Sequence, residues 1–246
     1  MRLKPRKFQV TALLLASLGA AGCNMYSQLD ESDDRADQIE QGRYDGDDGD
    51  CVTARDRLAN ITPLDDDQRF SLGFAHLCVG GATLENIGAT VANYTTGSGT
   101  DYTLVGNLAR RLLPYSVSKN LQISQGTDVF RDITTPNRRA YASLVGHLAR
   151  LAIITARAAG DRTTLVRDDI SLEANCTSVA ACTAAGMTDA DATEFKTEVL
   201  TMAADASSIS LPGLADLAAG LNSTFAGLAT ADAVRFYVRT SVVPAN

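Results

Sequence analysis

The sequence predicts an all-α fold, either an irregular helical bundle or a set of stacked helical hairpins. Alanine is abundant, only 6 of the 246 residues are proline, and 45% of residues are hydrophobic, a composition that favours packed helices over many short strands. Apolar residues recur at helical spacing along most of the chain, and a strand-like alternation is found only at Tyr237 to Val243. We therefore expect one helical domain over residues 51–246.

Residues 1–22 have the pattern of a signal peptide. Four basic residues precede an apolar run from Val10 to Leu18, which is shorter than the roughly 20 residues that span a membrane. The run ends in Ala20-Ala21-Gly22-Cys23, which resembles the bacterial lipobox, with alanine where that motif usually has leucine. The resemblance implies that Cys23 carries diacylglycerol and a further acyl chain such as palmitate, which together anchor a protein stably. Ordinary secretion with a free Cys23 is the alternative.

The mature chain is strongly acidic. Removal of residues 1–22 takes away four positive charges and lowers the formal net charge from −7 to −11. Such a balance argues against nucleic acid as a partner, because neutralising phosphates requires clustered Lys and Arg. Residues 23–50 are predicted to form a lipid-anchored acidic tether, with a first helix at about Asp34 to Gln41. By resemblance to the sorting rules of bacterial lipoproteins, Asn24 after the cysteine implies the outer membrane, with the chain facing the periplasm or the cell surface.

Two predicted helices, 51–61 and 66–79, form a hairpin across Thr62-Pro63-Leu64-Asp65. Each carries an apolar stripe at helical spacing, which comprises Cys51, Ala54, Leu58 and Ile61 on the first and Phe70, Phe74, Leu77 and Cys78 on the second. In an antiparallel hairpin the start of the first helix lies beside the end of the second. With Cys23 assigned to lipid, four cysteines remain, and we predict that Cys51 pairs with Cys78.

The same region resembles the junction between two tetratricopeptide repeats. Pro63 is followed at the family's spacing by Leu72-Gly73-x-x-His76, with His76 in the place of the usual aromatic residue. The resemblance covers about 30 residues. It implies helical hairpins that stack into a binding surface.

The rest of the chain reads as further helices. A Pro at the first helical position after Thr135, and Gly160 at the end, bound a long helix over 137–159, which is apolar on most of its circumference and is therefore the predicted centre of the core. Thr188 begins another helix with a capping pattern. The remaining predicted helices are 82–94, 102–113, 117–123, 162–174, 189–206, 212–221 and 230–242.

Cys176 and Cys182 enclose five residues and are predicted to form a second, local disulfide. Zinc is the competing interpretation for the cysteines. It is disfavoured because the chain has no CxxC pairs with partner histidines.

Few residues point to catalysis or metal binding. The two histidines, His76 and His147, are each expected to pack at the edge of a core, and the chain has no nucleophile elbow, zinc-protease motif or phosphate loop. One acidic segment has the density of a calcium loop, and its carboxylates are Asp45, Asp47, Asp48 and Asp50. It departs from the EF-hand pattern, so an exposed acidic turn is the preferred interpretation. No cofactor is expected.

These features predict a lipid-anchored, non-enzymatic helical scaffold or assembly accessory for a protein partner in the bacterial envelope. The alternative is a carrier in which helices 102–113 and 137–159 wall a cavity for a small apolar ligand or lipid. An enzyme would need a pocket that places a carboxylate within reach of His76 or His147.

Overall fold

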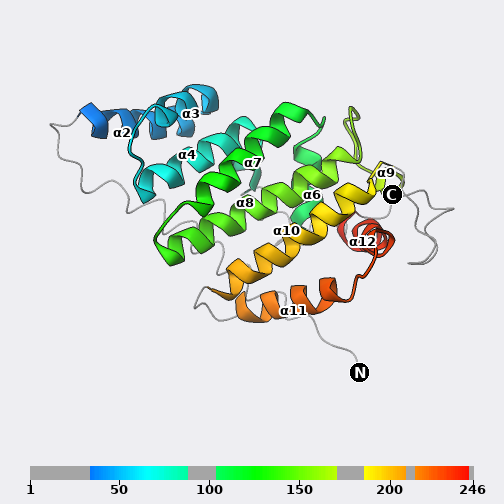
Figure 1. The fold of residues 1–246 in the computed structure, drawn as a ribbon. Helices are drawn as coiled ribbons and strands as arrows, with labels where there is room; N and C mark the ends of the chain where they lie inside the picture. The colour runs from blue at the N-terminus through cyan, green and yellow to red at the C-terminus, as the bar shows by residue number, and fades with distance from the viewer. Residues whose placement is uncertain (1–33, 88–103, 171–185, 209–213, 244–246) are drawn as a thin grey trace.

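The computed structural model describes residues 34–87, 104–170, 186–208 and 214–243, and every regular element within these ranges is helical (Figure 1). The elements are α2 (Asp34–Asp47), α3 (Cys51–Ala59), α4 (Asp66–Val79), α6 (Leu104–Arg111), α7 (Val117–Arg131), α8 (Pro136–Arg157), α9 (Arg167–Ile170), α10 (Asp189–Ser207), α11 (Leu214–Ala226), α12 (Ala231–Tyr237) and a π-helix (Val238–Val242). The predicted all-α fold is confirmed. Among the described helices, none combines the length and the apolar character needed to cross a membrane.

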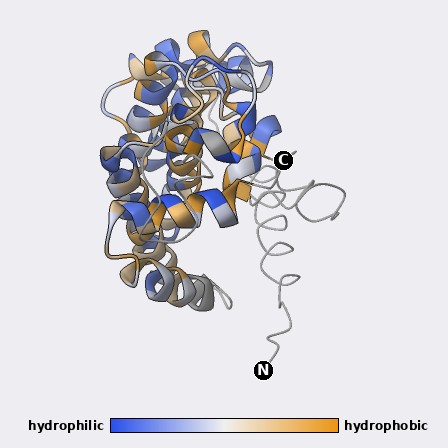
Figure 2. Cartoon of the chain, turned by 90° about the vertical axis from the view of Figure 1, so that its right-hand side faces the viewer, coloured by the Kyte–Doolittle hydropathy of each residue, from blue (hydrophilic) through white to orange (hydrophobic). Residues whose placement is uncertain are grey.

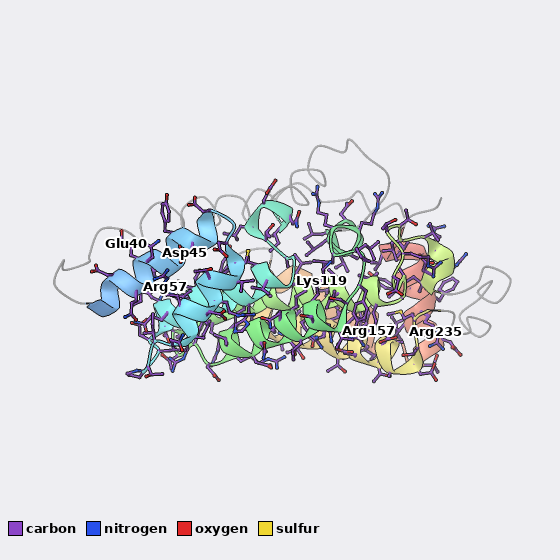
Figure 3. All side chains as sticks on the ribbon, turned by 90° about the horizontal axis from the view of Figure 1, so that it is seen from above. Glu40, Asp45, Arg57, Lys119, Arg157 and Arg235 are labelled. Carbon is purple, nitrogen blue, oxygen red and sulfur yellow. A yellow bond between two sulfur atoms is a disulfide. The ribbon has the colours of Figure 1, made fainter. Side chains whose placement is uncertain are left out.

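The helices form an elongated row that follows the order of the chain. α2 packs against α3, α3 against α4, α4 against α7, α7 against α8, α8 against α10, and α10 against α11. α6 lies against α8, and α12 lies against α10. Seen from above, α2 occupies one end of the row and α12 the other (Figure 3).

Helix starts were predictable where the sequence carries a capping motif. The carboxylate of Asp65 accepts from the backbone of Gln68, whose side chain accepts in return from the backbone of Asp65, so α4 spans the predicted residues 66–79. Thr188 and Asp191 form the same reciprocal pair at the start of α10. The predicted helix 82–94 is described only in part, and residues 84–87 of it are helical.

The predicted helix 117–123 is wrong in its length, because α7 continues to Arg131. Its second half contains Gly126 and Thr127, which are poor helix formers. Both are buried. A Cβ on Gly126 would lie 2.7 Å from the carbonyl oxygen of Gly73 on α4, so close packing of α4 on α7 selects a glycine there and overrides local propensity.

Other predicted bounds also differ: α2 continues to Asp47 instead of ending at Gln41, and α11 continues to Ala226 instead of ending at residue 221. The predicted helix 162–174 begins only at Arg167. Residues 162–166 are not helical, and Asp169 of α9 accepts from the backbone N–H of Val166 at the start of the helix. The alternation from Tyr237 to Val243 is helical, not strand-like. Val234, Val238 and Val242 are four residues apart and all buried, which is helical spacing.

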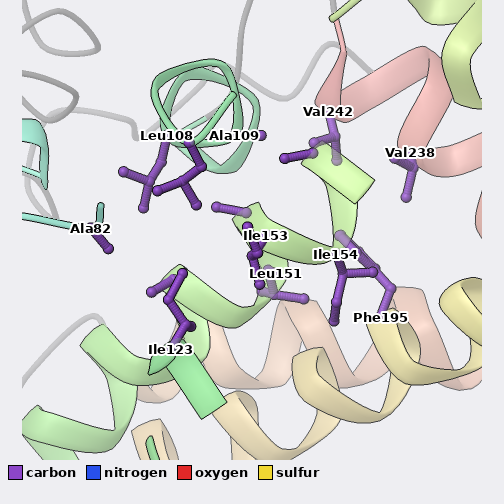
Figure 4. Close-up of a cluster of buried hydrophobic side chains, with 14 of the residues drawn as sticks. Ala82, Leu108, Ala109, Ile123, Leu151, Ile153, Ile154, Phe195, Val238 and Val242 are labelled. Atoms are coloured by element: carbon purple, nitrogen blue, oxygen red, sulfur yellow. The ribbon is translucent and has the colours of Figure 1, made fainter. Parts of the chain in front are cut away.

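α8 is the centre of the core, as the sequence predicts. Of its 22 residues 13 are buried, and Leu151, Ile153 and Ile154 meet Leu108 of α6 and Phe195 of α10 in one cluster (Figure 4). Hydrophobic and hydrophilic residues are interspersed along the helices that Figure 2 shows.

A second, smaller core holds α2 and α3 on α4. Its buried members are Ile39, Ala54, Leu58, Ile61, Leu72 and Ala75. The Cys51–Cys78 disulfide joins the start of α3 to the end of α4, with 5.5 Å between the Cα atoms, which confirms the predicted pairing.

A clasp on Asp66 joins the start of α4 to the α7–α8 connection. Its carboxylate accepts four hydrogen bonds, from the backbone N–H and hydroxyl groups of Thr134 and Thr135, at 2.6–2.9 Å. These bonds hold the pKa of Asp66 far below its usual value. The first turn of α4 is thereby fixed beside the start of α8.

Candidate functional site

The most concentrated set of charged side chains in the described structure lies between α8 and α10. We call it the α8–α10 charge ladder. It consists of His147, Arg150 and Arg157 on α8 and of Asp191, Glu194, Glu198 and Asp205 on α10. On each helix, successive members are three, four or seven residues apart, so they lie on one face of that helix. The two helices are antiparallel, and basic residues of one stripe therefore meet acidic residues of the other.

His147 lies at the end of the ladder nearest the C-terminus of α10. Its side chain is fully buried, its Nδ1 lies 2.5 Å from Glu198 Oε2, and its Nε2 lies 3.2 Å from Asp205 Oδ2. Burial alone lowers the pKa of His147, but the hydrogen bonds and negative charges of Asp205 and Glu198 outweigh it and raise the pKa above 6.5. Burial alone would raise the pKa of Glu198. The hydrogen bond from His147 and the positive charges of His147 and Arg150 outweigh burial, so the pKa is lowered. Between about pH 4.5 and pH 6.5 the pair is therefore an imidazolium and a carboxylate.

The two arginines continue the ladder toward the start of α10. Arg150 contacts Glu194 and Glu198, and Arg157 Nη1 donates to Asp191 Oδ1 at 2.6 Å and to Glu194 Oε2 at 3.1 Å. On α7 the side-chain oxygen of Asn120 accepts from both guanidinium groups, at 3.0 and 3.2 Å. The ladder thus ties three adjacent helices together.

The acidic start of α10 also reaches α12. Arg235, which is only 3% exposed, pairs with Asp189 and with Asp232. Figure 3 shows Arg157 and Arg235 toward the end of the molecule that lies opposite α2. An open hollow of about 560 Å³ lies over the exposed side of α10, and the residues that line it are Asp189, Ala190, Thr193, Glu194, Thr197 and Glu198.

The geometry of the ladder suits the joining of helices. Both nitrogens of His147 are engaged and the ring is closed to solvent, so the imidazolium offers no lone pair to a substrate. Every ladder carboxylate faces a cation at one or both oxygens. The ladder therefore fixes how α10 lies on α8, and with it the surface that these helices present.

The structure brings some of the predicted site residues together. Cys51 and Cys78 are bonded, whereas Cys23, Cys176 and Cys182 lie outside the described residues. His76 is half-buried on α4, and its Nδ1 lies 2.8 Å from Gln122 Oε1. Burial, only partly opposed by that hydrogen bond, lowers the pKa of His76.

The four aspartates of the calcium alternative are spread over α2, the turn after it and the start of α3. Asp45 accepts from Arg57 Nε at 3.0 Å, and Asp50 caps α3 by accepting from Thr53 N at 3.2 Å (Figure 3). Asp48 is exposed, and the side chain of Asp47 is not described. Within the described ranges, no group of three or more His, Cys, Asp or Glu side chains is arranged to hold a metal ion.

Sequence reasoning missed the ladder, and it placed His147 at the edge of a core, where the structure buries it completely. A signal was present, since both stripes repeat at helical spacing. What the sequence does not contain is the information that α8 and α10 lie side by side.

No protein family, curated protein or solved structure matches this chain.

The ladder predicts a large loss of stability on replacing Glu198. Glu198→Gln is expected to lower the free energy of unfolding by about 3 kcal/mol, because it leaves the His147 imidazolium and Arg150 without their shared carboxylate in a buried place. Since the pKa of Glu198 is lowered on folding, its contribution is present above about pH 4.5 and is lost as the pH falls. Urea unfolding at pH 6 and pH 4 measures both effects.

Glu194→Gln is the matched control. Glu194 is 29% exposed, and Asp191 and Glu198 remain to pair with the two arginines, so a loss of about 1 kcal/mol or less is expected. Equal losses for the two variants would contradict the assignment of Glu198 as the central carboxylate.

Proposed function

We propose that this chain is a lipid-anchored protein of the bacterial outer membrane that acts as a non-enzymatic helical scaffold or assembly accessory for a protein partner. Cys23 is the anchor. It lies eleven residues before Asp34, the first residue of α2. The residues between the two include Asp30, Glu31 and Asp33 and are the acidic tether that the sequence predicts.

One observation carries the scaffold role, namely that successive helices pack in chain order into an elongated row (Figures 1 and 3). A row of this kind offers continuous surfaces that cross several helices, as stacked hairpins do in repeat proteins. The tetratricopeptide-like residues Leu72 and Gly73 lie in this row on α4. The charge ladder and the Asp66 clasp fix neighbouring helices against each other, so the surface is pre-organised for a partner.

The large apolar side chains on the surface are candidate contact points. The most exposed of these in the described structure are Tyr44, Val52, Leu84, Val117 and Leu121. Val117 and Leu121 are one turn apart on α7 and are 74% and 53% exposed, so they form a pair on one face of the row. Interfaces commonly use such side chains as anchors.

The anchor predicts a change of mass and of location on replacing Cys23. Full-length protein expressed in its own host and labelled with an alkyne fatty acid is expected to incorporate the label and to sediment with outer-membrane vesicles. Cys23→Ala is expected to lose both the label and the sedimentation. An unlabelled wild-type chain with a free amino terminus at residue 23 would overturn the anchor.

The scaffold role is tested in cells with a photo-crosslinking residue at each of the five exposed apolar positions. Protein adducts of one mass from both Val117 and Leu121 are expected, with Ser223, exposed on α11, as the control position. The carrier alternative predicts the opposite pattern. No position would yield a protein adduct, and native mass spectrometry of the purified chain would show a retained small apolar molecule.

A further inference from the structure

We propose that His147 is a protonation-dependent latch that joins α8 to the C-terminal part of α10. The two ring nitrogens face two different carboxylates, Glu198 and Asp205, at hydrogen-bond distance. A carboxylate can only accept, so both nitrogens must donate, and only the imidazolium has two N–H groups. With both acids ionised, the geometry therefore requires the protonated ring.

Loss of one proton breaks one of the two contacts. Glu198 has a second partner in Arg150, and Arg131 of α7 also acts on it by charge. Asp205 has no second side-chain partner among the described residues, and its distance to the ring is the longer of the two. The neutral ring therefore keeps its N–H toward Glu198 and turns a lone pair toward Asp205, which frees Asp205.

The freed contact lies at the C-terminal end of α10, where α10 packs against α11. Asp205 is in the last turn of α10, and Ala203 and Ala206 beside it pack with Ala218 of α11 in a small cluster separate from the main core. Small side chains bury little apolar area, so the electrostatic contact carries a larger share of the attachment there. Opening of the latch loosens the end of α10 together with α11.

The direction of the pH dependence follows from the same contacts. The pKa of His147 is higher in the folded than in the unfolded chain, so the latch is complete below about pH 6.5 and opens as the pH rises through the folded-state value. The latch does not depend on the anchor or on the scaffold role.

Amide hydrogen exchange on the full-length chain tests the latch. Rates are measured at pH 6 and pH 9 and are corrected for the intrinsic effect of pH on exchange. In the wild type, protection of residues 203–208 and 218–226 is expected to fall by about tenfold from pH 6 to pH 9, as for the loss of one charge-assisted hydrogen bond. Protection in α7 is expected to stay constant.

Three variants decide whether His147 causes the change. His147→Gln and Asp205→Asn are expected to show reduced protection at pH 6 and no further loss at pH 9, whereas His76→Gln, which removes the only other histidine, is expected to behave as the wild type. Asp205 is 33% exposed, so its variant tests the latch even if His147→Gln fails to fold. Equal protection of the wild type at both pH values, or the same fall in Asp205→Asn as in the wild type, would overturn the proposal.

Discussion

Replacing Phe130 with alanine is expected to lower the free energy of unfolding by about 4 kcal/mol. The Phe130 side chain is fully buried on α7, and its ring contacts Phe74 and Phe70 of α4 with centroid distances of 5.3 and 6.2 Å. Truncation leaves a cavity at the point where α4, α7 and α8 meet. Urea unfolding followed by circular dichroism measures the loss.

The same ring explains why α4 carries glycine at position 73. A Cβ built on Gly73 would lie 2.2 Å from Cε1 of Phe130, a distance that real side chains do not adopt. Gly73→Ala is therefore expected to destabilise the protein by about 2 kcal/mol through overpacking. In the Phe130→Ala background the methyl group enters the cavity instead, so the double variant is expected to be more stable than the sum of the two single losses predicts.

Gly220→Ala is the matched control for the glycine. Gly220 lies on the exposed side of α11, and no atom lies within 4 Å of a Cβ built on it. This substitution is expected to raise stability by up to about 1 kcal/mol, because alanine is the better helix former. Additive losses for Phe130 and Gly73, within about 0.5 kcal/mol, would show that the two residues do not share the space.

The sequence determines the helix starts better than the helix contacts. Asp65 with Gln68 and Thr188 with Asp191 are local motifs, so the starts of α4 and α10 could be predicted to the residue. The length of α7 could not, because Gly126 is selected by a backbone 53 residues away in the sequence, that of Gly73. Nor does the local sequence say that the group approaching Gly73 is the ring of Phe130.

In the candidate site too, the contacts set by local sequence were predictable and those between distant helices were not. The pairing of Cys51 with Cys78 was predictable because a short hairpin fixes which helix ends meet. The pairing of His147 with Glu198 and Asp205 was not, because it depends on how α10 returns along α8 after the 31 residues between them. Residue type suggests a buried histidine at a core edge, and only the tertiary arrangement supplies two carboxylates to one ring.

Replacing both Cys51 and Cys78 with serine is expected to lower the free energy of unfolding by about 3.5 kcal/mol, the chain-entropy value for a loop of this size. The cysteines are 27 residues apart in the sequence. Urea unfolding of the double variant measures the loss, with the oxidised wild type as the reference. A midpoint equal to that of the oxidised wild type would contradict a stabilising disulfide.

Where hydrogen exchange rises on removal of the disulfide distinguishes this prediction from a general weakening of the fold. The second core packs α2 and α3 on α4 with six small or medium apolar residues, in a cluster separate from the one around α8. The disulfide is the covalent tie between α3 and α4, so its removal is expected to raise hydrogen exchange in α2 and α3 far more than in α8. A uniform rise in all helices would instead mean that the two cores unfold as one cooperative unit, and that the disulfide acts only through the unfolded chain.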